Sequence, residues 1–354
     1  MCHITVVAQG GGPVRRDVRR SFLMPGTTRG RLLATSDIHV RHPENRAVVE
    51  AMRPSHDDDW LLVVGDVGEL LDDVEWALRL LAGRFAQVVW VPGNHELWTL
   101  SRDTADLRGE ARYRHLVELC RGLGVLTPED PYPVWTGQGG PARIVPMFLL
   151  YDYTFRPDGT STKEEALAAA YAAGVVCSDE SVLHPDPYPS RDAWCRARVA
   201  LTQARLDECP RDVPLVLVNH FPLVREPTRI LRYPVFAQWC GTELTADWHT
   251  RYNVAAVVYG HLHIPRTTVH DGVRFEEVSV GYPREWRSWR TRRPVLRQIL
   301  PAPTGEPVPP WGAPHDESEH AALQVPPGAP GGPVPAAPAV RTSQPQRPYR
   351  QGAV

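Results

Sequence analysis

Residues 60–68 read Trp60-Leu-Leu-Val-Val-Gly-Asp-Val-Gly68, a short apolar run that ends in a glycine and an aspartate. Runs of this kind, apolar on both faces and rich in β-branched residues, are typical of strands buried inside a sheet. The same pattern predicts strands over 31–35, 60–64, 87–91, 142–148, 214–218, 255–259 and 273–280. Helical patterns lie between them, over 44–52, 72–82, 104–120 and 190–208. This alternation predicts an α/β sheet that is enclosed on its faces.

Residues that can bind metal ions follow five of these predicted strands. In chain order they are Asp37 and His39, Asp66, Asn94 with His95, His220, and His261 with His263. Residues two apart in an extended segment point to the same face, so Asp37 and His39 can reach one ion. A turn or a helix cap explains an isolated Asp or Asn equally well. Because the carboxyl ends of the strands converge on one crevice in an open α/β sheet, the five segments can meet there.

The five segments resemble the motifs of the calcineurin-like metallophosphoesterases, which are D-x-H, G-D, G-N-H-[D/E], a single H and G-H-x-H, in this order. The resemblance extends over roughly 31–300. It implies a four-layer α/β/β/α sandwich made of two mixed sheets flanked by helices. It also implies a dinuclear metal site in which Asp37, His39 and His263 hold one ion, Asn94, His220 and His261 hold the other, and Asp66 bridges both.

The expected chemistry is the hydrolysis of phosphoric mono- or diesters, with a bridging hydroxide attacking phosphorus in line. Oxygen and imidazole ligands without thiolate suit Mn, Fe, Zn, Co or Ni, and the sequence does not distinguish among them. His95 stands next to a ligand without being one, and the resemblance assigns it the role of general acid or charge stabiliser. Glu96 is either a residue that orients His95 or a surface or capping carboxylate.

The motifs do not specify the substrate, which we expect to be a phosphorylated small molecule, a nucleotide or a phosphoprotein. Residues 65–71 lack the arginine that the protein Ser/Thr phosphatase branch carries there, and this disfavours that branch. Arg41, Arg102 and Arg225 lie near the motifs, but only Lys163 among the 39 basic residues is a lysine, so codon bias explains the abundance of arginine. The alternative is a catalytically silent metal-binding scaffold or interaction protein with the same fold, although every expected ligand is present.

Composition restricts the partners and the location. The 39 Lys and Arg nearly balance the 41 Asp and Glu, which makes nucleic acid an unlikely partner. No apolar stretch is long enough to span a membrane, so we expect no membrane association. The six cysteines are scattered without a C-x-x-C pair, which favours the reducing cytoplasm. Residues 19–23 resemble a twin-arginine export signal, but no apolar stretch follows them.

Three segments of unequal character divide the chain. Residues 1–30 are expected to be a poorly ordered extension, 31–300 the metallophosphoesterase domain, and 301–354 a disordered tail in which 14 of the 36 prolines fall. Residues 151–189, helical only around 163–173, form either a lid or wall of the site or a plain surface excursion. We expect Trp286 and Trp289 to pack rather than to line the substrate pocket, and His115 to be an ordinary surface or packing residue.

Overall fold

The computed structural model describes residues 29–287 and 294–304, which all belong to the first of two compact units, residues 1–314. The predictions for the N-terminal extension and for the C-terminal tail fall almost wholly outside these residues, and so does the prediction for Trp289.

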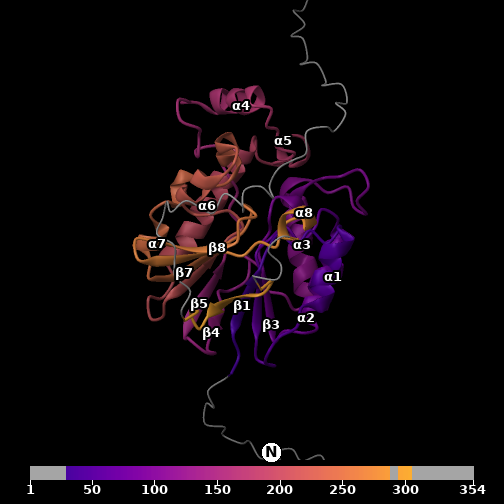
Figure 1. Cartoon of the computed structure of the whole chain (residues 1–354), viewed down its shortest axis with the longest axis vertical. Coiled ribbons are helices and arrows are strands. Elements are labelled where there is room, and N and C mark those ends of the chain that lie inside the picture. Colours follow the sequence, from indigo (N-terminus) through magenta and orange to yellow (C-terminus); the bar gives the residue numbers. More distant parts are fainter. Residues whose placement is uncertain (1–28, 288–293, 305–354) are drawn as a thin grey trace, which may run out of the picture. The chain divides into compact units, whose positions relative to one another are not determined.

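Two mixed sheets form the centre of this unit (Figure 1). The first has the order β10-β1-β2-β3, with the bounds Arg297–Leu300, Leu32–Thr35, Trp60–Val63 and Gln87–Trp90. The second has the order β4-β5-β6-β7-β9-β8, with the bounds Val134–Trp135, Ala142–Pro146, Leu215–Val218, Val254–Tyr259, Val273–Glu277 and Arg266–His270. In both sheets the strands run parallel except for β10, β4 and β8, which pair antiparallel at the edges.

The strands are apolar on both faces because each face meets a different core. Leu32, Leu62 and Val89 of the first sheet join a buried cluster that also contains residues of the second sheet, such as Ile144 and Val216. Their neighbours along the strands, such as Leu33 and Leu61, belong to a second buried cluster that includes the helices. Side chains of successive residues in a strand point to opposite faces, so the two sheets pack on each other while helices cover their outer faces.

Helices supply the two outer layers. In Figure 1, helices α1 to α3 lie beside the first sheet, and α6 and α7 lie beside the second. The bounds of the α-helices are α1 Pro43–Ala51, α2 Leu71–Ala82, α3 Gly109–Gly122, α4 Lys163–Ala172, α5 Asp179–Val182, α6 Arg191–Asp207, α7 Trp248–Arg251 and α8 Pro283–Trp286. Four 3-10 helices complete the set, namely η1 His95–Leu97, η2 Glu226–Ile230, η3 Pro234–Trp239 and η4 Glu243–Thr245. The structure confirms the predicted α/β/β/α arrangement. Within the part of the chain that it describes, no helix is long and apolar enough to cross a membrane.

All seven predicted strands are present, and three further strands were not predicted. The pattern missed β4 because it is two residues long, and β8 because its sequence Arg-Thr-Thr-Val-His is largely polar. It missed β10 because only two of its four residues are buried. The helix predicted over 104–120 begins later, at Gly109.

The two sheets are joined at the carboxyl ends of β1 and β9. Ser36 forms an isolated parallel bridge with Ser279, and the amide of Val280 donates to the carbonyl of Ser36 at 2.8 Å. The amide of Asp37 donates to the carbonyl of Gly65 at 3.0 Å, which brings the end of β2 to the same point. This junction places the polar residues that follow the strands of both sheets at one edge of the sandwich.

Candidate metal centre

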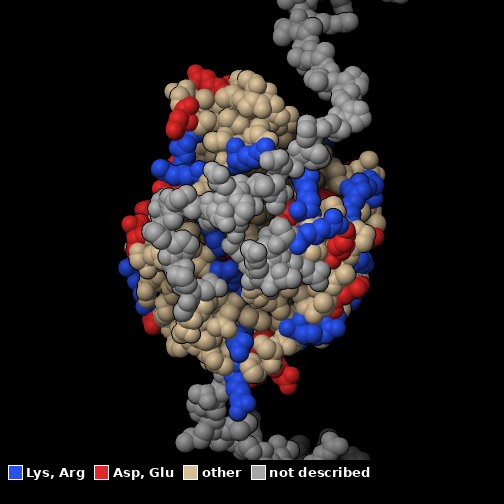
Figure 2. Space-filling model, in the orientation of Figure 1, with Lys and Arg blue, Asp and Glu red and all other residues tan. Residues whose placement is uncertain are grey.

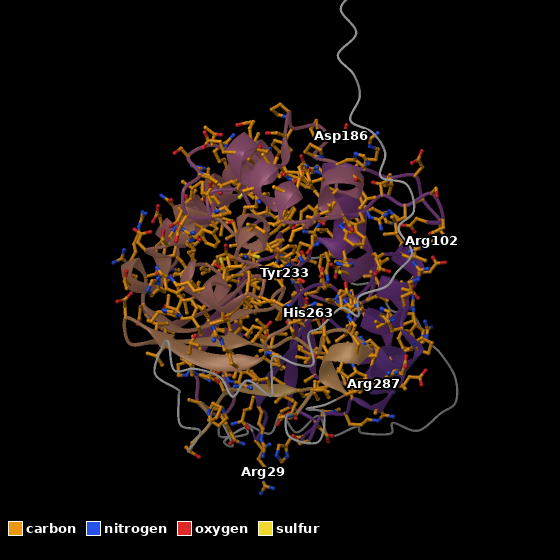
Figure 3. The ribbon with its side chains drawn as sticks, turned by 45° about the horizontal axis from the view of Figure 1, so that its top comes forward. Arg29, Arg102, Asp186, Tyr233, His263 and Arg287 are labelled. Atoms are coloured by element: carbon orange, nitrogen blue, oxygen red, sulfur yellow. The ribbon has the colours of Figure 1, made fainter. Side chains whose placement is uncertain are left out.

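The predicted ligands gather at this junction. Three groups of side chains have their donor atoms within 4.8 Å of one another, and these groups are Asp37, His39 and His263; His39, Asp66 and His95; and Asp66, His220 and His261. Shared members connect the groups into one cluster. In Figure 3, His263 lies where the indigo N-terminal part of the ribbon meets the orange part, so the cluster draws on both sheets.

The backbone at the centre adopts conformations that side chains normally avoid. Of the seven non-glycine residues with positive φ in the described part of the chain, five are predicted ligands, namely Asp37, His39, Asp66, His261 and His263, with φ between 34° and 70°. Such conformations cost on the order of 1–3 kcal/mol each and cluster at functional sites. The concentration of strain therefore marks the same residues as the motifs do.

The glycines of two motifs are required by close packing against ligands. A Cβ at Gly93 would lie 2.1 Å from Oδ1 of Asp66, and one at Gly260 would lie 2.1 Å from Oγ of Ser36 and 2.4 Å from Oδ2 of Asp37. No side chain fits at these distances, so glycine is needed for the backbone to pass directly behind the two carboxylates.

Asp66 lies between three imidazole rings. Its Oδ1 is 3.5 Å from Nε2 of His220, and its Oδ2 is 3.7 Å from Nε2 of His95 and 4.0 Å from Nε2 of His39. Burial alone would raise the pKa of Asp66, but the neighbouring histidines outweigh it and hold the pKa well below its ordinary value. The carboxylate is thus ionised, and it faces both halves of the cluster, which is the position that a bridging ligand needs.

Asp37 and His263 form the core of one half. Oδ1 of Asp37 lies 3.1 Å from Nε2 of His263, and that nitrogen lies 3.3 Å from Nε2 of His39. On its other side, Nδ1 of His263 lies 2.7 Å from Oε2 of Glu285, a carboxylate that orients the ring. Burial lowers the pKa of His39 well below its ordinary value, so this ring is neutral and has a lone pair to offer.

The other half contains three buried polar atoms that lack a hydrogen-bond partner, Oδ1 of Asn94, Nε2 of His220 and Nε2 of His261. Nδ1 of His220 lies 2.8 Å from the carbonyl of Val64, which leaves Nε2 as the atom facing the cluster. Burial, together with repulsion from His220, lowers the pKa of His261 to about 3. Buried polar atoms are seldom left unpaired, and an oxygen and two imidazole nitrogens fit a divalent ion.

Glu69, rather than Glu96, contacts His95. Oε1 of Glu69 is 3.3 Å from Nδ1 of His95, and the ring stacks on Trp98 with 3.7 Å between centroids. Glu96 is fully buried and accepts hydrogen bonds from the amides of Asp66, Val67 and Gly93 at 2.8–3.0 Å. The interpretation of Glu96 as the residue that orients His95 is therefore wrong. It is a capping carboxylate, but it is buried, and its hydrogen bonds join the segment around Asp66 to the segment around Gly93. Glu69 was present in the sequence, three residues after Asp66, but its role was missed.

Other predicted features are resolved as well. Arg41 and Arg102 are exposed, while Arg225 donates to the carbonyl of Arg156. Trp286 is buried and its Nε1 donates to Oδ1 of Asn45 at 2.7 Å, so its predicted packing role is confirmed. The 151–189 segment reaches the cluster through Asp179 of α5, which accepts a hydrogen bond from Nδ2 of Asn94 at 3.0 Å and makes this part of the segment a wall.

Comparison with known proteins assigns the family. The chain matches the family described as calcineurin-like phosphoesterase over residues 30–265, and it belongs to that family. It is therefore a hydrolase of phosphoric ester bonds in a family that uses divalent metals, and its His/Asp cluster could hold such ions.

One relative agrees with this assignment in both sequence and structure. The chain is 60% identical over 274 residues to the [acyl-carrier-protein] phosphodiesterase PptH of Mycobacterium tuberculosis, an alignment that covers 77% of this chain and 84% of the relative. The crystal structure of phosphopantetheinyl hydrolase (PptH) from the same organism is similar with a TM-score of 0.77 and 58% identity, covering 80% of this chain and 100% of that one.

Proposed function

We propose that this chain is a metal-dependent phosphodiesterase that removes the phosphopantetheinyl group from an acyl carrier protein. The observation that carries the proposal is the 60% identity with an acyl-carrier-protein phosphodiesterase over most of both chains. The clustering of six of the seven predicted ligands, all except Asn94, supports the same reaction class. We further propose that the reaction takes place in the cytoplasm, in keeping with the five free cysteines among the described residues.

The proposed centre holds two divalent ions. Asp37, His39 and His263 would bind one, and a second group, Asn94, His220 and His261, would bind the other, with Asp66 shared between them. Such ions would lower the pKa of a water molecule and neutralise charge on the phosphoryl oxygens. Mn, Fe, Zn, Co and Ni all suit this set of donors.

The chain's own part in the reaction is the movement of a proton. Hydrolysis adds water to phosphorus and breaks the bond from phosphorus to the serine oxygen of the carrier protein. The water oxygen stays on the released phosphopantetheine, and the serine oxygen gains a proton. We assign His95 as the donor of that proton, because Glu69 and Asp66 outweigh the effect of burial and raise the pKa of His95, which favours its protonated form.

The test uses intact holo-acyl carrier protein and detects its conversion to the apo form by mass spectrometry. The wild-type enzyme loaded with Mn(II) is expected to release phosphopantetheine, and a chelator is expected to abolish the release. Asp66→Ala, which removes the proposed shared metal ligand, and His95→Ala, which removes the general acid, are each expected to lower kcat by at least about 100-fold. The exposed His115→Ala on α3 is the matched control and should retain full activity.

Two simple aryl substrates distinguish a phosphodiesterase from a phosphomonoesterase and from an inactive scaffold. Hydrolysis of a bis-aryl phosphate in preference to an aryl phosphate supports a phosphodiesterase, whereas the reverse preference contradicts it. Activity that survives chelation or Asp66→Ala would refute the metal-dependent mechanism. If the enzyme binds metal but hydrolyses none of the three substrates, the chain is a silent scaffold instead.

A further inference from the structure

Asp179 is a buried carboxylate outside the motifs that contacts two parts of the centre. It has no exposed surface and lies on α5, 85 residues after Asn94 in the chain. Its Oδ1 accepts from Nδ2 of Asn94 at 3.0 Å and from Nε1 of Trp98 at 2.6 Å. Its Oδ2 accepts from the hydroxyl of Tyr151 at 3.0 Å. Three donors therefore pair both oxygens of this buried carboxyl group.

The backbone around Asp179 is held in place from both sides. Nη1 of Arg191, at the start of α6, donates to the carbonyls of Asp179 at 3.1 Å and Leu183 at 2.9 Å. The amide of Thr99, just after η1, donates to the carbonyl of Val182 at 2.9 Å. The carboxylate is thus presented to Asn94 by a short helix that is fastened to the site and to the second layer of helices.

The amide group of an Asn side chain carries an oxygen and an NH2 group. Asn binds a metal ion only when the oxygen faces the ion. A carboxylate can only accept hydrogen bonds, so it draws the NH2 group of Asn94 to itself and turns Oδ1 the other way. That oxygen is one of the buried atoms without a hydrogen-bond partner. Asp179 also accepts a hydrogen bond from Nε1 of Trp98, and the indole ring of Trp98 stacks on the ring of His95. This hydrogen bond therefore helps to hold the ring of His95 in place.

We infer that Asp179 is a positioning residue, which orients Asn94 with its oxygen towards the metal centre and holds Trp98 against the ring of His95. The inference rests on the proposed metal site. It gives the 151–189 segment a function in the reaction, since this segment supplies the residue that selects the amide orientation. The acceptor character of the side chain, not its charge, is what this role requires.

Three variants distinguish the effect of Asp179 on the orientation of Asn94 from the effect of its charge and from a general loss of stability. Asp179→Leu removes both acceptor oxygens and is expected to weaken one of two Mn(II) binding steps by about 10–100-fold, as for other residues that orient metal ligands. Asp179→Asn keeps an oxygen for Asn94 and Trp98 and turns its NH2 group to the Tyr151 oxygen, so both binding steps should stay within about threefold of wild type. Tyr151→Phe removes only the donor to Oδ2 and is the control for a lost buried hydrogen bond.

Calorimetric titration of metal-free protein with Mn(II) measures the affinities, and kcat and KM are measured on the same samples. Asp179→Leu should lower kcat with little change in KM, and Tyr151→Phe should lower the melting temperature without changing metal affinity. Loss of metal binding in Asp179→Asn, or in Tyr151→Phe, would overturn the inference even if Asp179→Leu does not fold. Wild-type protein that takes up no Mn(II) contradicts the proposed function, whereas unchanged affinity in Asp179→Leu contradicts only the inference.

Discussion

Arg112 of α3 is a fully buried cation that ties together the two loops carrying Glu69 and His95. Its Nε donates to the carbonyl of Glu96 at 2.6 Å and its Nη2 to the carbonyl of Glu69 at 2.9 Å. Its Nη1 forms an ion pair with Oδ2 of Asp103 at 2.6 Å, and the side chain of Asp103 is itself 1% exposed. We predict that Arg112→Met destabilises the fold severely and also impairs catalysis.

The magnitude follows from what the substitution leaves behind. Removing one partner of a buried ion pair costs about 3–5 kcal/mol, because the remaining charge stays buried and unpaired. Each carbonyl that loses its donor adds on the order of 1–3 kcal/mol unless water reaches it. A free energy of unfolding lowered by about 5 kcal/mol corresponds to a melting temperature lowered by about 10 °C or more in a domain of this size.

Thermal unfolding followed by circular dichroism measures the effect. Arg114→Met is the matched control, since Arg114 lies on the same helix with its side chain 72% exposed and should change the melting temperature by less than about 2 °C. Adding Asp103→Asn to Arg112→Met removes the unpaired charge and should recover part of the loss. Equal melting temperatures for Arg112→Met and Arg114→Met, or no recovery in the double variant, would refute the reasoning.

Three further predictions concern the site and the fold around it. Glu69→Gln removes the charge beside His95 and should lower kcat by about 10–100-fold with little change in KM, which steady-state kinetics checks. Gly260→Ala places a Cβ 2.4 Å from Oδ2 of Asp37, so the folded variant should bind less metal, as elemental analysis would show; wild-type metal content would contradict this. Asp192→Asn tests the pH dependence of stability. Burial would raise the pKa of Asp192, but the hydrogen bonds and charge of Ser190 and Lys163 outweigh burial and lower the pKa from 3.8 to about 2. The pairing therefore stabilises the fold above pH 3.8 and is lost as the pH falls through 2, so melting temperatures of variant and wild type should differ slightly at pH 7 and converge in acid.

The arginines near the motifs show one limit of reading a sequence. On the face shown in Figure 2, basic and acidic side chains are interspersed. Arginines near the motifs in sequence proved to be exposed or engaged elsewhere, as Arg225 is with the carbonyl of Arg156. Nearness to a motif in the sequence does not show where a long side chain on a loop will lie, because loops are positioned by the elements that they pack against.

Much of the fold could be predicted because its main strands are buried on both faces. A strand such as β2 must be apolar along its whole length, and this pattern is visible without any knowledge of its neighbours. Strands that are very short, polar or only partly buried lack this pattern, and β4, β8 and β10 escaped prediction for that reason. The motif residues were equally visible, because each follows a buried strand directly.

By itself the sequence determined the α/β alternation, the set of candidate metal ligands and the order in which they follow the strands. Only the tertiary structure decided which residues support them. Glu69, in the loop after β2, contacts His95 after β3, and Glu96, next to His95 in the chain, bonds instead to the amides of Asp66 and Gly93. Asp179 reaches Asn94 from 85 residues away. Ligands can be recognised from the local pattern of strand and turn, whereas their hydrogen-bond partners depend on distances between segments that the order of residues does not encode.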